Sequence, residues 1–256
     1  MHDNRMTTEI LTIDKGQCLT DVLPAIPANT IFDKTITGCG ATHSEIVNAA
    51  RHSIIIEPNI PVILGKKAEH PFLFAVYEGI TKEDVKAYLA GEHDGYRKII
   101  TTPEGFDKKV LPAMHELEIP VYKDYFLLFD ECEKAIQDVG YRGDIYLPVE
   151  DFFKFENKAM VSATPIVPSD PRFEENGFKI LKLVPTYDSR IELTLCTTNN
   201  TVAVMRKLLK RLENETVCVF LNSTETILSL IYALRLQGRS RVFCSEKSVR
   251  KLKQMN

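Results

Sequence analysis

The sequence predicts an α/β protein in which a parallel sheet is flanked by helices. Short runs rich in Ile, Leu and Phe recur along the chain, and stretches with helical periodicity lie between them. Such apolar runs are typical of strands that helices cover on both faces. The chain has 256 residues, of which 44% are hydrophobic and 26% charged, so it can bury a large core.

The elements follow one another in a regular order. Five strands are expected, at Thr30–Ile36, Ser53–Glu57, Lys98–Thr102, Tyr125–Phe129 and Ala159–Val161. Helices are expected between them, at His43–Arg51, Lys82–Leu89, Glu104–Leu117 and around Glu150–Phe155. The chain has no internal repeat with a fixed period, which excludes a solenoid.

A seam is expected near residue 165, where TPIVPSDPRFEENG holds three prolines. We predict a first lobe over residues 1–165, a linker with extended segments over 166–199, and the start of a second α/β lobe over 200–256. In that second part TVAVMRKLLKRL and TETILSLIYALRLQG predict helices, whereas VCVFLN and RVFCS predict strands. About 50 residues are roughly a third of a typical domain. A partner protein or downstream sequence is therefore expected to complete this lobe.

The charge, the cysteine content and the apolar runs of the sequence exclude several classes of protein. The formal net charge is −3, so contact with nucleic acid requires a local basic face. Six cysteines include no CxxC pair, which fits a reducing compartment better than a disulfide framework. The opening residues MHDNRMTTEI do not form a signal peptide, and no apolar run is long enough to span a bilayer. We expect a cytoplasmic protein.

A glycine-rich segment, DKTITGCGATHSEI, joins the first expected strand to the first helix. Glycines let backbone amides turn toward a phosphate, and the start of a helix favours negative charge. A standard phosphate loop ends in Gly-Lys-Ser/Thr, whereas Gly40, Ala41 and Thr42 stand at these positions. The segment is either a degenerate phosphate loop or a glycine turn between a strand and a helix.

Two acids directly follow the apolar run FLLF in DYFLLFDECEKAI. Because ligands of parallel sheets gather at the carboxyl ends of the strands, Asp130 and Glu131 should face a site there. An aspartate at such a place can hold Mg²⁺ through a water, and a glutamate can deprotonate an attacking water. The alternative is that both acids favour the first turn of a following helix. About 30 residues later, MVSATPI places small hydroxyl residues at the end of the next strand.

The order and spacing of these motifs resemble those of superfamily 2, or DExx-box, helicases. In that family a glycine loop is followed by an acidic DExx motif and then by SAT, as GCGAT, DECE and SAT follow one another here. Weaker matches are the PN of SIIIEPN and the segment TTPEGF. VCVFLNSTETILSLIYAL resembles the start of the second lobe of the family. The resemblance covers about residues 30–245.

The resemblance implies a RecA-like P-loop NTPase lobe, followed by an incomplete second lobe, that uses ATP to act on DNA or RNA. Asp130 and Thr42 would hold Mg²⁺ through water, and Glu131 would be the catalytic base. Residues that would bind the nucleotide are Gly38, Cys39, Gly40, Ala41, Thr42 and His43. Ser162, Ala163 and Thr164 would couple the site to lobe movement. Residues that would contact nucleic acid are Pro58, Asn59, Thr102 and Pro103.

The sequence departs from the pattern of the family at two points. Ala41 cannot supply the positive charge that neutralises the phosphates, and Lys34 should have little reach from its strand. The arginine finger of the second lobe, worth roughly 10³–10⁵ in rate, has no counterpart. We therefore expect poor ATP hydrolysis by this chain alone. Two alternatives stay open: a catalytically inactive helicase relative that binds nucleic acid or a partner, and an unrelated nucleotide-binding enzyme.

Overall fold

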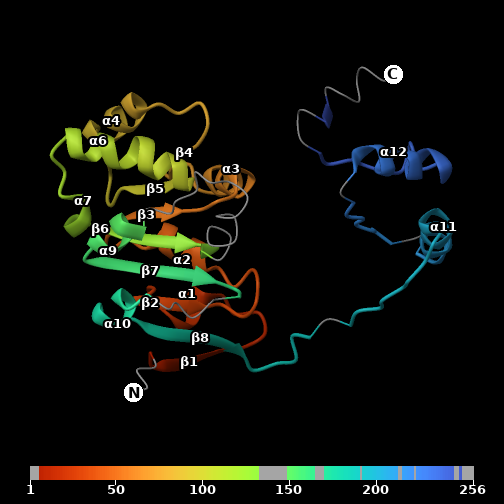
Figure 1. The fold of residues 1–256 in the computed structure, drawn as a ribbon, viewed down its shortest axis with the longest axis horizontal. Coiled ribbons are helices and arrows are strands. Elements are labelled where there is room, and N and C mark those ends of the chain that lie inside the picture. The colour runs from red at the N-terminus through yellow and green to blue at the C-terminus, as the bar shows by residue number, and fades with distance from the viewer. Residues whose placement is uncertain are drawn as a thin grey trace. The chain divides into compact units, whose positions relative to one another are not determined.

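The computed structural model describes residues 6–132, 149–164, 170–190, 192–212, 215–221, 223–244 and 248–249. The chain divides into two compact units, Met1–Arg190 and Ile191–Asn256. The first unit contains the sheet and the expected nucleotide site. The second contains α11 (Thr201–Arg211) and α12 (Thr224–Ala233) (Figure 1).

In the described part of the first unit, eight strands form one sheet in the order β1-β8-β2-β7-β6-β3-β5-β4 (Figure 1). Every neighbouring pair is parallel, so the carboxyl ends of the strands meet at one edge, where ligands of open α/β sheets bind. The bounds are β1 Thr8–Ile13, β2 Thr30–Asp33, β3 His52–Ile56, β4 Phe74–Val76, β5 Lys98–Thr101, β6 Tyr125–Asp130, β7 Asn157–Ser162 and β8 Lys179–Pro185.

Helices cover both faces of this sheet and bury a core on each. One face packs against α4 (Lys82–Ala90), α6 (Leu111–Glu116), α7 (Val121–Asp124), α9 (Val149–Lys154) and α10 (Arg172–Glu175). The other face packs against α1 (Leu19–Val22), α2 (Ala41–Val47) and α3 (Ile60–Glu69). Ile54 and Ile56 of β3 face the first core and Ile55 the second, which explains why the run SIII is apolar without alternation.

The segment TTPEGF begins at the last residue of β5 and leads into a continuous helical stretch. It begins as α5 (Pro103–Gly105), passes through a π-helical turn (Phe106–Val110) and continues as α6. Gly105 is buried, and a Cβ added there would lie 2.5 Å from Oγ1 of Thr101 and 3.2 Å from the carbonyl oxygen of Val76. Only glycine lets the start of this helix approach the strand ends so closely.

The five expected strands are present with shifted ends, and the two-sided α/β fold class is confirmed. β1 and β4 add to the expected set. β1 is an edge strand with mostly exposed residues, and β4 has only three residues, so neither gives a strong apolar run. α3 is also additional, because Pro61 and Gly65 interrupt its helical pattern.

The structure corrects the expected linker over residues 166–199. β8 lies within it and pairs with β1 and β2, so this extended segment belongs to the sheet. The backbone of β8 pairs with one side of β2, and β7 pairs with the other side. The first unit therefore extends to Arg190, beyond the expected boundary at residue 165.

The strands expected in the second unit are also corrected. The described residues of VCVFLN and RVFCS, 217–221 and 241–244, belong to no strand. Two isolated strands cannot shield both of their faces, so pairing between them would be marginal. Phe220 and Phe243 are accordingly 91% and 90% exposed.

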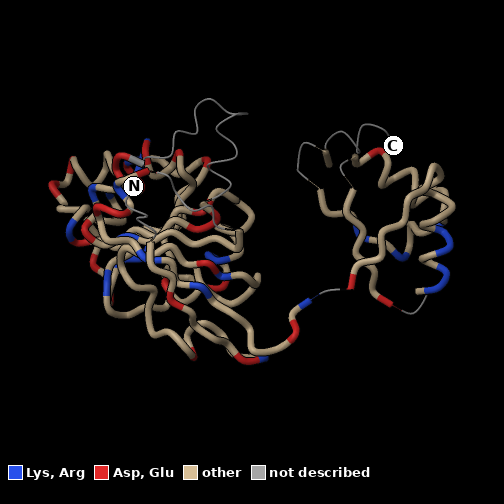
Figure 2. Tube along the Cα trace, turned by 60° about the horizontal axis from the view of Figure 1, so that its bottom comes forward, with Lys and Arg blue, Asp and Glu red and all other residues tan. Residues whose placement is uncertain are grey.

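Figure 2 shows acidic and basic residues interspersed over the described part of the first unit. This mixture agrees with the small net charge of −3. Within the described ranges, no helix is long and apolar enough to cross a lipid bilayer.

Candidate nucleotide site

The loop between β2 and α2 turns sharply at the carboxyl edge of the sheet. Gly38 and Gly40 have φ values of 75° and 87°, a left-handed conformation that residues with a side chain rarely adopt. These φ values favour glycine at both positions. A Cβ added at either glycine would meet no atom of the described residues within 4 Å, so these residues leave space beside the loop, as phosphate binding requires.

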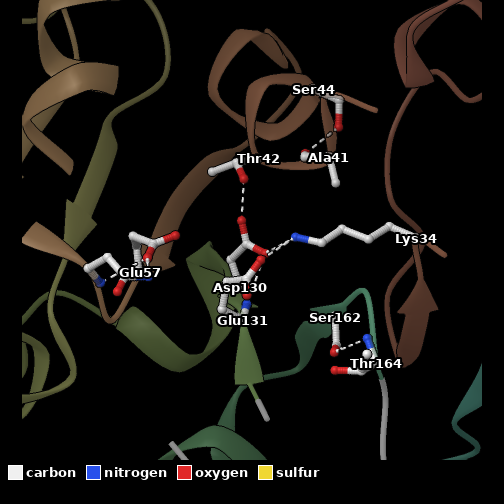
Figure 3. Close-up of polar contacts among 10 residues, drawn as sticks. Lys34, Ala41, Thr42, Ser44, Glu57, Asp130, Glu131, Ser162 and Thr164 are labelled. Carbon is white, nitrogen blue, oxygen red and sulfur yellow. Dashed lines mark hydrogen bonds and ion pairs between the residues drawn. The ribbon is translucent and has the colours of Figure 1, made fainter. Parts of the chain in front are cut away.

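Thr42 and Asp130 meet at this edge. Thr42, in the first turn of α2, donates its hydroxyl hydrogen to Oδ2 of Asp130, the last residue of β6 (Figure 3). The motif order predicts this proximity, and the contact is direct. Glu131 follows with a φ of 51°, and its N–H donates to Oδ1 of Asp130 at 2.9 Å. Such an uncommon backbone conformation is frequent at functional sites.

Lys34 reaches both acids from the end of β2, which corrects its expected short reach. Its Nζ lies 3.2 Å from Oδ1 of Asp130 and 2.7 Å from Oε1 of Glu131 (Figure 3). Only β7 separates β2 from β6, and strands lie about 4.8 Å apart, so the side chain has to cross a single strand. Burial disfavours the ammonium, but Asp130 and Glu131 outweigh it and raise the pKa of Lys34 above its usual range.

Glu57 is a third acid at this edge, outside the expected set of site residues. It follows β3, is 2% exposed, and accepts two hydrogen bonds of 2.8 Å from the backbone and side chain of Asn59. Burial, and then the negative charge of Asp130, raise the pKa of Glu57 to about 7. The signal that could have found it is an acid directly after an apolar run, the same pattern that marks Asp130.

Replacing Glu57 with glutamine should stabilise the protein at alkaline pH. The pKa of Glu57 rises from 4.5 to about 7 on folding. The folded state therefore binds more protons across this window, and its stability falls as the pH rises through it. We expect the free energy of unfolding of Glu57→Gln to exceed that of the wild type by about 3 kcal/mol at about pH 8 and to match it near pH 4.

Urea unfolding across this pH range measures the effect, with Glu92→Gln as a control at an exposed position. The control should follow the wild type. A Glu57→Gln variant with an unchanged pH dependence would contradict the pKa assigned to Glu57.

The SAT segment lies beside the acids. Ser162 ends β7, is fully buried, and accepts the N–H of Thr164 at 2.9 Å (Figure 3). Ala163 is half-buried and Thr164 exposed, and the chain bends at these two residues after the end of the strand. Coupling of this turn to lobe movement stays a prediction. Pro165 and Ile166 lie outside the described residues.

The four residues expected to contact nucleic acid lie at the neighbouring ends of β3 and β5. The side-chain amide of Asn59 donates a hydrogen bond to Glu57. The hydroxyl of Thr102 caps α5 by accepting the N–H of Gly105. Pro58 and Asn59 are half-buried, whereas Thr102 and Pro103 are buried. Contact with nucleic acid stays a prediction, for which Pro58 and Asn59 are the more accessible pair.

Three other loop residues direct their side chains elsewhere. Cys39 and Ala41 are each 4% exposed and pack into the core on the α2 side of the sheet. Any contact of these two residues with a nucleotide would therefore be through the backbone. Nδ1 of His43 lies 3.2 Å from Nε2 of His70, so the two rings form a hydrogen bond.

A buried cluster of charges, which the sequence motifs did not indicate, holds α2 against the sheet. Glu45 is fully buried and accepts hydrogen bonds from Arg51 and Ser53, and Nζ of Lys98 lies 3.6 Å from it. The guanidinium of Arg51 also lies 3.4 Å from the ring centre of Phe126. Burial lowers the pKa of Lys98 to about 8. The cluster fixes the helix that carries the loop threonine.

Thr42 and Asp130 supply the kind of ligand that Mg²⁺ prefers. Hydroxyl and carboxylate oxygens are hard donors, and Mg²⁺ is commonly held by one or two carboxylates together with water and phosphate oxygens. Among the residues that the structure describes, no group of three or more His, Cys, Asp or Glu side chains could hold a metal ion.

The parallel sheet, its flanking helices and the loop at its carboxyl edge define a parallel α/β fold consistent with a RecA-like lobe. The crystal structure of the DUF1998 helicase MrfA is similar, with a TM-score of 0.55 and 14% sequence identity. The match covers 89% of this chain and 39% of that helicase, so the chain spans about two fifths of its length. At this identity the likeness concerns the fold. No protein-family model and no curated protein matches the sequence.

Proposed function

We propose that this chain is a helicase-like motor, or the N-terminal part of one, that binds ATP with Mg²⁺ and acts on nucleic acid. The observation that carries the proposal is the contact of Thr42 with Asp130 beside an open glycine loop. The two residues lie 88 positions apart, in the two motifs whose chemistry suggested a nucleotide site. The shared fold of a helicase supports the same class.

Each residue of the site would have a separate role. Thr42 and Asp130 would hold Mg²⁺, which supplies positive charge against the phosphate oxygens. Glu131, whose side chain is 23% exposed, would accept a proton from the attacking water. Pro58 and Asn59, at the end of β3, would contact the nucleic acid. A partner protein or downstream sequence would complete the second lobe.

One observation favours a second candidate function, a catalytically inactive module that binds nucleic acid or a partner. Glu131 is engaged by the ammonium of Lys34 at 2.7 Å, and Ala41 leaves the loop without its lysine. A carboxylate paired with a cation holds its charge more firmly and is a weaker base. Such a chain would not hydrolyse ATP.

Binding and hydrolysis measurements separate the two candidates. The affinity for Mg-ATP is measured first, and then ATP hydrolysis with and without single-stranded and duplex DNA and RNA. A motor should hydrolyse ATP faster when nucleic acid is present. Glu131→Gln should retain the affinity and lose about 10²–10⁴-fold of the rate, the usual contribution of a general base. Glu92→Gln removes an equal charge outside the site and should leave both unchanged.

Binding of Mg-ATP without hydrolysis under any of these conditions would favour the inactive module. The absence of Mg-ATP binding would reject the proposed nucleotide site.

A further inference from the structure

Lys34 places an ammonium at the centre of the proposed nucleotide site. The residue is 8% exposed, and its Nζ contacts Asp130 at 3.2 Å and Glu131 at 2.7 Å. Asp130 in turn accepts the hydroxyl of Thr42 (Figure 3). The ammonium thus shares a carboxylate with the hydroxyl that would hold Mg²⁺, close to the place expected for the terminal phosphates.

The backbone on either side of the Lys34 side chain is held by contacts with neighbouring strands. The N–H of Lys34 donates to the carbonyl of Ser162 on β7 at 2.9 Å. The next residue, Thr35, has a φ of 40°, an outlying value for a β-branched residue. Its hydroxyl donates to the carbonyl of Leu183 on β8 at 2.5 Å, and its N–H donates to Asp33 at 3.1 Å. A strained turn persists only where its surroundings determine it, and here three strands do so.

We infer that Lys34 takes the place of the lysine missing at Ala41 and binds the terminal phosphates of the nucleotide. The inference rests on the proposed function. Without nucleotide, Lys34 neutralises the adjacent charges of Asp130 and Glu131. With Mg²⁺ bound, Asp130 would be neutralised by the metal, and the ammonium of Lys34 would be free to turn to a phosphate oxygen. Glu131 would then be released to accept a proton, so its pairing with Lys34 belongs to the nucleotide-free state.

The Lys34→Met variant tests this inference because it keeps the length of the side chain and removes its charge. Its affinity for Mg-ATP should fall about 10–100-fold, the usual range for losing a hydrogen bond to a charged group. Its affinity for AMP, which lacks the terminal phosphates, should change little. Lys182→Met is the matched control: Lys182 lies level with the end of β2, and its side chain is 46% exposed. The control should bind both nucleotides as the wild type does.

Two further variants strengthen the comparison. Lys34→Met/Ala41→Lys moves the charge to the standard loop position and should restore the affinity for Mg-ATP. Lys34→Met/Glu131→Gln removes one charge of each sign, so it should fold even where the single variant does not. Compared with Glu131→Gln alone, it should show the same selective loss of ATP over AMP. Thermal unfolding without nucleotide confirms that each variant is folded.

Wild-type affinity for Mg-ATP in a folded Lys34→Met variant would overturn the inference and leave the proposed function standing. Equal losses of ATP and AMP affinity would also overturn it, because they indicate a purely structural role. If the unmodified chain does not bind Mg-ATP, the proposed function fails, and the inference fails with it.

Discussion

The Asp130→Ala variant is expected to lose about 3 kcal/mol of its free energy of unfolding, the lower end of the cost of breaking a buried ion pair. Asp130 is 2% exposed, and its removal leaves the hydroxyl of Thr42 without its acceptor and Lys34 without one of its two carboxylates. Glu131 still pairs with Lys34, which limits the loss. The Mg²⁺-dependent part of ATP binding should disappear as well. Urea unfolding near neutral pH and binding with and without Mg²⁺ measure the two effects.

Asp188→Ala is the control for the stability measurement. Asp188 pairs with Arg190, but its side chain is 59% exposed, so its loss should leave the free energy of unfolding essentially unchanged. An Asp130→Ala variant as stable as this control would show that the contacts at the sheet edge contribute nothing to the fold.

The Glu45→Ala variant is expected to lose still more, about 4 kcal/mol. Its carboxylate is fully buried and is the counter-ion of Arg51 and of Lys98, both on the sheet side of α2. Without it, two positive charges lie near each other with little solvent to screen them. Because Glu45 belongs to α2, we also expect weaker nucleotide binding through displacement of the loop. Chemical unfolding measures the first effect and Mg-ATP affinity the second.

A double variant distinguishes loss of charge from loss of packing. Glu45→Gln keeps most of the shape of the side chain and should destabilise the fold through its charge alone. Adding Lys98→Met should recover part of that loss, because it removes one uncompensated cation. Glu83→Ala is the exposed control, with a side chain 70% exposed, and should cost less than about 1 kcal/mol. If Lys98→Met adds to the loss instead, charge compensation is not the role of Glu45.

The central strands and the convergence of Thr42 with Asp130 could be predicted from the sequence for one physical reason. A strand covered on both faces must be apolar throughout, so runs such as SIII and FLLF identify it. Once these strands are parallel, their carboxyl ends share an edge, and residues far apart in sequence must meet there. Edge strand β1 could not be predicted in this way, because most of its residues are exposed and it has no continuous apolar run.

The rest of the site depends on features that sequence spacing does not encode. The reach of Lys34 follows from the position of β7 between β2 and β6, and that strand order is a property of the assembled sheet. The elevated pKa of Glu57 depends on its burial beside Asp130. The cluster around Glu45 joins a residue of α2, Arg51 of the segment before β3, and residues of β3 and β5, and no local motif marks it.

The late position of β8 in the chain has a consequence for folding during synthesis. Among the described strands β1 pairs only with β8, and Thr30 of β2 pairs with Lys179, about 150 residues later. At about 5–20 residues per second, a ribosome needs about 7–30 s to make that stretch. Until then the nascent chain carries β1 without a neighbour and β2 with an open edge. Open strand edges are templates for pairing with other chains, so nascent chains that end before Pro185 are exposed to association with one another.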